Sequence, residues 1–177
     1  LSLHDALPIS KEDIALLFNE KFGTSKNNTP EELTGFVRNQ LRQKFVNADI
    51  GITGGNFIIA DIGGIALTEN EGNALLTVSF PKIHIAIVGF EKLIPSIKDL
   101  QTFWPLLSTH GTGQNVTVYN SILTGPRKKN EQGGPEHMYV ILVDNGRSRL
   151  LARPEQRRAL SCIRCGACLN GCPVYRN

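Results

Sequence analysis

The stretch IGITGGNFIIADIGGIALTENEGNALLTVSFPKIHIAIVGF, residues 50–90, decides the fold class of this protein. It contains short runs rich in isoleucine, valine and leucine, each bounded by glycine, asparagine or proline. Runs of this length and composition favour buried strands separated by tight turns. The expected strands are residues 50–53, 57–61, 65–68, 75–80 and 83–88, and the expected turns are residues 54–56, 63–64 and 70–73.

Helical patterns precede and follow these strands. Thr29-Pro30-Glu31-Glu32 supplies a capping threonine, a proline at the first helical position and a glutamate at the third, so an amphipathic helix of about four turns should begin there. Apolar spacing predicts two further helices, over residues 11–22 and 93–107, and Pro105 should disturb the end of the second. Helices combined with short buried strands indicate an α/β sheet with helices packed on its faces.

The second half of the chain also contains strand and helix patterns, and it ends in a cysteine-rich segment. Strands are expected at residues 116–119, 122–123 and 138–143. Residues 125–136 form a polar segment with two prolines and three glycines, and an ordered loop of that length is often functional. A short helix is expected in the sequence PEQRRAL, which starts at Pro154.

Composition excludes several classes of protein. The 177 residues, 41% of them apolar, are enough for one domain with a buried core. The longest apolar run, residues 83–90, is far shorter than the roughly 18 residues of a membrane span, so we expect no transmembrane segment. The net charge is only +3, and no basic stripe alternates with stacking aromatic residues, which argues against nucleic-acid binding.

All four cysteines lie within one short run near the end of the chain: Cys162, Cys165, Cys168 and Cys172. With the following proline they fit C-x2-C-x2-C-x3-C-P, the spacing that places three thiolates around a 4Fe-4S cluster. In two-cluster modules the fourth cysteine ligates the other cluster, so Cys172 is expected to reach a second cluster. Its partner run should then lie beyond Asn177.

Two alternatives remain for these sulfurs. Structural zinc usually takes two separated cysteine pairs rather than a single run. A disulfide framework would distribute its cysteines along the chain, so a reducing compartment is expected and we predict a cytoplasmic protein. Arg164 and Arg176 would favour a reduced, more negative cluster, or they are solvated surface charges.

The first ten residues, LSLHDALPIS, look like a short-read sequencing adapter translated in frame, and the alternative is an ordinary flexible terminus. They lack the basic start and the small-residue cleavage site of a signal peptide. If the adapter interpretation holds, the chain is a fragment of a longer protein.

Several blocks of sequence resemble the lactate-utilisation iron-sulfur proteins, the B component of a three-protein system that oxidises L-lactate to pyruvate. The blocks, in order, are ADIGITGGNFIIADIGGIALTENEGNALL, HIAIVGFEKLIP, TGPR, GPEHMYVILVDNGRSRLL and CIRCGACLNGCPVYR. The resemblance implies a LUD domain, similar to the sugar-phosphate isomerase and CoA-transferase fold, at residues 11–150 and truncated at its N-terminal side. It also implies the first half of a two-cluster ferredoxin module at residues 151–177. Asp61-Ile62-Gly63 departs from the Glu-Thr-Gly more usual in that family.

What the resemblance implies is an electron-transfer subunit of an NAD-independent L-lactate dehydrogenase complex. Such a subunit works with the other subunits and is not expected to be active alone, and its electron acceptor is unknown. A second hypothesis is an enzyme in which the LUD domain acts on a phosphorylated or CoA-linked substrate and the clusters are structural. A third is a zinc-stabilised interaction module.

Candidate binding residues lie at the expected turns, because open α/β sheets bind ligands at strand ends. These are Asn56, Glu71 and Asn73, with Glu71 either a base or a cap of its own turn. Thr109, Gly113 and Gln114 could hold an anion through backbone amides. Arg127 is the preferred carboxylate clamp, with a plain surface arginine as the alternative. His84 lies within an apolar strand, where a hydrogen-bonded core histidine is the favoured interpretation over a catalytic one.

Overall fold

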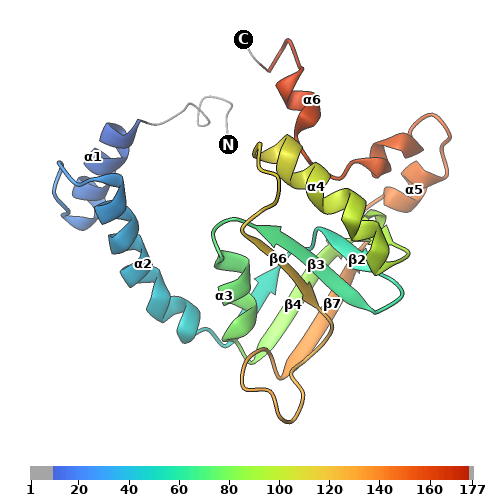
Figure 1. Cartoon of the computed structure of the whole chain (residues 1–177), viewed down its shortest axis with the longest axis horizontal. Helices are drawn as coiled ribbons and strands as arrows, with labels where there is room; N and C mark the ends of the chain where they lie inside the picture. The colour runs from blue at the N-terminus through green and yellow to red at the C-terminus, as the bar shows by residue number, and fades with distance from the viewer. Residues whose placement is uncertain (1–9, 176–177) are drawn as a thin grey trace. The chain divides into compact units, whose positions relative to one another are not determined.

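The computed structural model describes residues 10–175, apart from the side chain of Asn170. The predicted adapter segment therefore lies outside the described residues except for Ser10, and Arg176 lies outside them as well. The chain folds into two compact units, and the boundary lies between Val46 and Asn47 (Figure 1).

The first unit contains two helices whose starts are fixed by their caps. Helix α1 spans Lys11–Phe22 and helix α2 spans Pro30–Val46, so both predicted helices are confirmed. The Thr29 hydroxyl accepts a hydrogen bond from the Glu32 amide at 3.2 Å, and the Glu32 carboxylate accepts one from the Thr29 amide at 2.9 Å. This reciprocal pair satisfies amides that otherwise have no partner at a helix start.

A parallel sheet forms the base of the second unit. Its order is β1 (Ile50–Thr53), β4 (Ile83–Gly89) and β7 (His137–Val143), with all pairs parallel. Along β4 the side chains alternate, so that His84, Ala86 and Val88 are buried on one face. This period of two is the pattern of a strand with one packed face.

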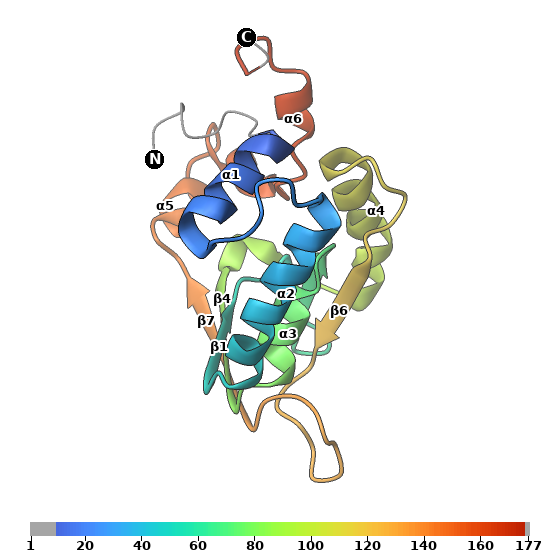
Figure 2. The same cartoon turned by 90° about the vertical axis from the view of Figure 1, so that its left-hand side faces the viewer.

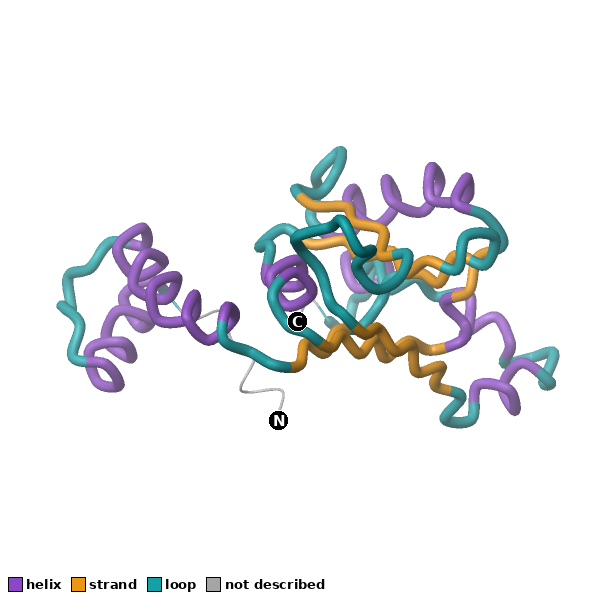
Figure 3. The backbone as a smooth tube through the Cα atoms, turned by 90° about the horizontal axis from the view of Figure 1, so that it is seen from below, coloured by secondary structure: helices purple, strands orange, loops and turns teal. Residues whose placement is uncertain are grey.

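A second, mixed sheet lies over that buried face. Its order is β5 (Leu93–Ile94), β2 (Phe57–Ile59), β3 (Gly64–Glu69) and β6 (Tyr119–Leu123), in which β2 runs parallel to β5 and β3 runs antiparallel to both its neighbours. The two layers of strands, with helix α4 (Leu100–Gly111) outside the mixed sheet, are visible from below (Figure 3). The predicted α/β class is confirmed.

The core has two parts, one on each side of the mixed sheet. Between this sheet and α4, the buried residues are Phe57, Ile59, Ala66, Ile94 and Leu100. Between the two sheets they are Ile65, Ala86 and Val88. Ile65 and Ala66, which are neighbours on β3, belong to different parts of the core. The mixed sheet is therefore buried on both faces.

The predicted strand at residues 75–80 is wrong, because helix α3 spans Asn73–Ser79. The Glu69 carboxylate accepts hydrogen bonds from the amides of Ala74 and Leu75, both at 2.7 Å, and so satisfies the start of this helix. A short apolar run cannot by itself distinguish strand from helix. Helix α3 packs on β1, where a Cβ at Gly51 would lie 2.0 Å from the Thr77 carbonyl oxygen.

Other boundaries also differ from the prediction. The expected helix over 93–107 is wrong at its start, because Leu93–Ile94 pairs with β2 and Ile97–Asp99 forms the 3-10 turn η3 before α4 begins. The strand expected at 116–119 is wrong apart from Tyr119, whereas the one expected at 122–123 is confirmed as part of β6. The strand expected at 57–61 ends earlier, at Ile59. After β7 come α5 (Arg147–Leu151), the 3-10 helix η4 (Arg157–Ser161) and α6 (Ala167–Asn170).

Among the described helices, none combines the length and the apolar character that crossing a membrane requires.

Candidate functional site

The carboxyl ends of the parallel strands carry a partly buried ion pair. Glu91 lies in the 3-10 turn η2 (Phe90–Lys92) after β4, and Arg147 begins α5 after β7. The Arg147 Nε lies 2.5 Å from the Glu91 Oε2, with side chains 21% and 9% exposed respectively. Gly89 leaves room for the Glu91 carboxylate, because a Cβ there would lie 2.1 Å from Oε2. The pair therefore ties α5 to the end of the central strand.

The cysteine run packs against the same unit through one apolar residue. Ile163, between the first two cysteines, is half-buried and packs against the core between the mixed sheet and α4, as do Phe103, Trp104 and Leu107 of α4. A Cβ at Gly111, the last residue of α4, would lie 3.5 Å from the Cys165 carbonyl oxygen. Cys165 thus lies beside the end of α4.

The chemistry of the four sulfur donors fits the predicted cluster. None of them is in a disulfide, and each is exposed or half-buried. Arg164 and Gly166 have φ values of 63° and 80°, in the left-handed region, so the backbone turns sharply on both sides of Cys165. Within the described residues, however, no three histidine, cysteine or acidic side chains are gathered closely enough to hold a metal ion. The donors fit by type and sequence spacing, and the cluster stays a prediction.

Lys92 and Arg164 lie near the first cysteine. Lys92, half-buried in η2, has a pKa below its ordinary value, chiefly because burial disfavours the charged ammonium and next because Arg164 is close. Glu91, and to a smaller extent Cys162, raise the pKa of Lys92. Lys92 therefore lies close to Cys162.

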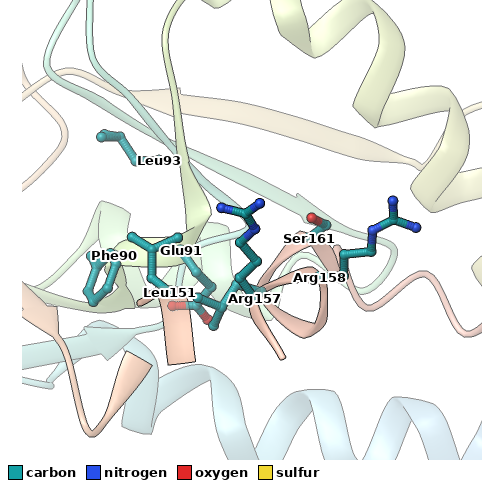
Figure 4. A pocket seen from close by; sticks show the side chains of 8 residues that line it. Phe90, Glu91, Leu93, Leu151, Arg157, Arg158 and Ser161 are labelled. Atoms are coloured by element: carbon teal, nitrogen blue, oxygen red, sulfur yellow. The ribbon is translucent and has the colours of Figure 1, made fainter. Parts of the chain in front are cut away.

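A pocket of about 520 Å³ adjoins this cluster of charges (Figure 4). One wall comes from the segment between β4 and β5, and the other comes from residues 151–161. The lining residues are Phe90, Glu91, Leu93, Leu151, Arg157, Arg158, Leu160 and Ser161.

Three of the predicted binding residues make local hydrogen bonds near the end of β3. The Asn56 Oδ1 accepts from the Thr68 amide at 2.9 Å. The Asn73 side-chain Nδ2 donates a hydrogen bond to the Glu71 carboxylate at 3.3 Å, and the Asn73 Oδ1 accepts one from the Ala74 backbone amide at 2.8 Å. Glu71 and Asn73 are the two of these candidates that the structure brings together, and the binding role of all three stays a prediction.

The other two predicted binding residues make different contacts. The Gln114 Oε1 accepts a hydrogen bond from the Thr112 hydroxyl. The backbone amides of Thr112 and Gln114 both donate to the Ser108 carbonyl, so neither of these two amides is directed at an anion. Arg127 pairs with Glu136 at 2.5 Å and closes the base of the loop before β7. That loop projects from one end of the sheets, and the cysteine run lies at the opposite end (Figures 1 and 2).

His84 is a core histidine, as its sequence context favours. Its side chain is fully buried, and its Nε2 lies 2.8 Å from the Thr53 hydroxyl. Burial lowers its pKa because the imidazolium loses hydration. Within the described chain its Nδ1 has no hydrogen-bond partner.

Sequence reasoning missed Glu91, Lys92, Arg147 and the pocket. A usable signal was present, because Glu91 and Arg147 each follow a strand of the parallel sheet within a few residues. The carboxyl ends of parallel strands lie at one edge, where ligands bind in open α/β sheets.

Comparison with known proteins finds a matching family, similar relatives and a similar solved structure. The LUD domain family matches residues 1–143. Proteins named lactate utilization protein B from Bacillus pumilus and Shouchella clausii are each 46% identical over 172 residues, which is 97% of this chain and 36% of theirs. The chain thus spans about a third of the length of these curated relatives. A crystal structure of a DUF162 family protein from Deinococcus radiodurans is 18% identical with a TM-score of 0.42, covering 57% of each chain.

Proposed function

Because the chain belongs to the LUD domain family, we propose that it is part of the iron-sulfur electron-transfer component of an NAD-independent system that oxidises L-lactate to pyruvate. The relatives named lactate utilization protein B support the lactate assignment. The observation that carries the electron-transfer role is the run of four unpaired cysteines with ferredoxin spacing, seated on the LUD domain.

Cys162, Cys165 and Cys168 would hold one 4Fe-4S cluster, and Cys172 would ligate a second. When bound, such a cluster supplies one-electron transfer, which suits the removal of two electrons from a 2-hydroxy acid one at a time. The electron acceptor and the other subunits of the complex are the partners that this role requires.

The residues of this chain would position and tune the cysteine run. Ile163 anchors it to the core beside α4, and the Glu91–Arg147 pair holds the preceding segment against the sheet. Lys92 and Arg164 place positive charge near Cys162. Positive charge favours a more negative, reduced centre, because opposite charges attract more strongly when partly buried.

The test is anaerobic reconstitution with iron and sulfide, both of this chain and of a form extended to the length of its relatives. We expect iron and acid-labile sulfide in the extended form, with a visible absorbance that dithionite bleaches. L-lactate should bleach it only when the partner subunits are added. Cys165→Ser should lose iron, whereas the matched change Ser161→Ala, outside the ligand set, should retain it.

Two results would exclude this function. Zinc or no metal in the extended form would favour an interaction module. Turnover of a phosphorylated or CoA-linked substrate by the isolated protein, without any redox change, would favour a LUD-domain enzyme with structural clusters.

A further inference from the structure

The pocket beside η2 and η4 combines an apolar wall with arginines. Phe90, Leu93, Leu151 and Leu160 supply the apolar surface. Arg157 and Arg158 come from η4, and neither has an ion pair among residues 10–175. Its volume of about 520 Å³ falls within the roughly 300 to 1,000 Å³ of small-molecule sites.

The single acidic group in the lining does not cancel this positive charge. Glu91 is paired with Arg147, and its side chain is only 9% exposed. Since a paired carboxylate is neutralised locally, the charges left to act on a ligand are the two guanidinium groups of η4.

The two arginines differ in position. In the view of Figure 4, the Arg157 side chain rises between Leu93 and Ser161, whereas the Arg158 guanidinium points away from Phe90 and Leu151. Arg157 is therefore the main anchor. A guanidinium fork matches the two oxygens of a carboxylate or a phosphate.

From this geometry we infer that the pocket binds a small organic anion, whose apolar body contacts Phe90, Leu93 and Leu151 and whose carboxylate or phosphate is held by Arg157. The site lies at the carboxyl edge of the parallel sheet, where open α/β sheets bind ligands. Ser161, which lines it, directly precedes Cys162. A ligand bound there would lie against the segment that leads into the cysteine run.

This inference does not depend on a cluster, so its test needs no iron. Phenyl phosphate is the probe, added to the 15N-labelled 177-residue chain and followed through the amide signals of Leu151, Leu160 and Ser161. Phenol and inorganic phosphate are its two halves, and benzoate replaces phosphate by carboxylate. We expect saturable shifts with phenyl phosphate or benzoate, and at least about ten-fold weaker binding of phenol and of inorganic phosphate.

Two variants separate the pocket from general surface charge. Arg157→Gln should weaken binding of the tighter aromatic anion about ten-fold, because a charge-assisted hydrogen bond is lost. Arg153→Gln removes an exposed arginine from the same segment, outside the lining, and should leave binding unchanged. Leu151→Gln removes apolar surface and should reduce the advantage of the aromatic anion over inorganic phosphate.

The inference is overturned if neither aromatic anion gives saturable shifts at these amides. It is also overturned if Arg157→Gln, with its other amide signals unchanged, binds as tightly as the parent chain, or if Arg153→Gln weakens binding equally.

Discussion

The Nε of Arg147 lies 2.5 Å from the Oε2 of Glu91, which joins the residues that follow two neighbouring parallel strands. This pair is the least exposed ion pair among the described residues. It holds α5, and with it the start of the segment that leads to the cysteines, at the carboxyl edge of the sheet.

Arg147→Ala should destabilise the fold by about 2 to 3 kcal/mol, because it leaves a nearly buried carboxylate without its partner. Urea unfolding followed by circular dichroism measures this loss. Arg127→Ala, which breaks the exposed pair with Glu136, is the matched control and should cost less than about 1 kcal/mol. Equal losses in the two variants would contradict the role given to the Glu91–Arg147 pair.

Gly51→Ala should destabilise the second unit by about 3 kcal/mol. An added Cβ would meet the backbone oxygen of Thr77 at 2.0 Å, so β1 or α3 must move. Gly54→Ala is the control, because nothing lies within 4 Å of a Cβ there and its φ is not in the left-handed region. Thermal unfolding should show a large drop in melting temperature for the first variant alone.

The stability should depend on pH through His84. Burial holds its pKa in the fold below 6.5, the ordinary value that the unfolded chain approaches. The unfolded state therefore binds the proton first as pH falls. The contribution of neutral His84 is complete above about pH 6.5 and is lost as pH drops through 6.5 toward the lowered pKa, by at most about 1.4 kcal/mol per pH unit.

Unfolding free energies measured between pH 5 and pH 8 would test this dependence. His84→Gln should flatten the curve in that range. His137→Gln, at an exposed position at the start of β7, should leave the curve as it is. An unchanged slope in His84→Gln would assign the dependence to other groups.

Lys92→Gln should lower the midpoint potential of the first proposed cluster, because it removes a half-buried positive charge near Cys162. A potentiometric titration followed by electron paramagnetic resonance measures the midpoint. Lys98→Gln changes an exposed lysine and serves as the control. A midpoint that rises, or that shifts equally in both variants, would count against this tuning.

Much of the fold could be predicted from local patterns. The Thr29–Glu32 capping pair fixes the start of α2, and the short apolar run of residues 83–88 predicts β4. Both signals depend on residues within a few positions of one another, which the sequence displays directly. The spacing of the four cysteines is equally local.

Other features were decided only by contacts between distant residues. Residues 73–79 form a helix although their composition is typical of a strand, and Gly51 on β1 leaves the space that this helix occupies. Leu93–Ile94 became a strand because β2 offered an edge to pair with. Whether a short apolar run forms helix or strand depends on the surface that it buries, and that surface exists only in the tertiary structure.

The same distinction applies to function. The proposed cluster ligands Cys162, Cys165, Cys168 and Cys172 could be predicted from the sequence alone, because residue type and spacing are properties of the chain. The tertiary structure alone decided that Glu91 meets Arg147, that Ile163 joins the core and that Arg157 borders a pocket. These residues are far apart in sequence, and only the packing of the two sheets and α4 brings them together.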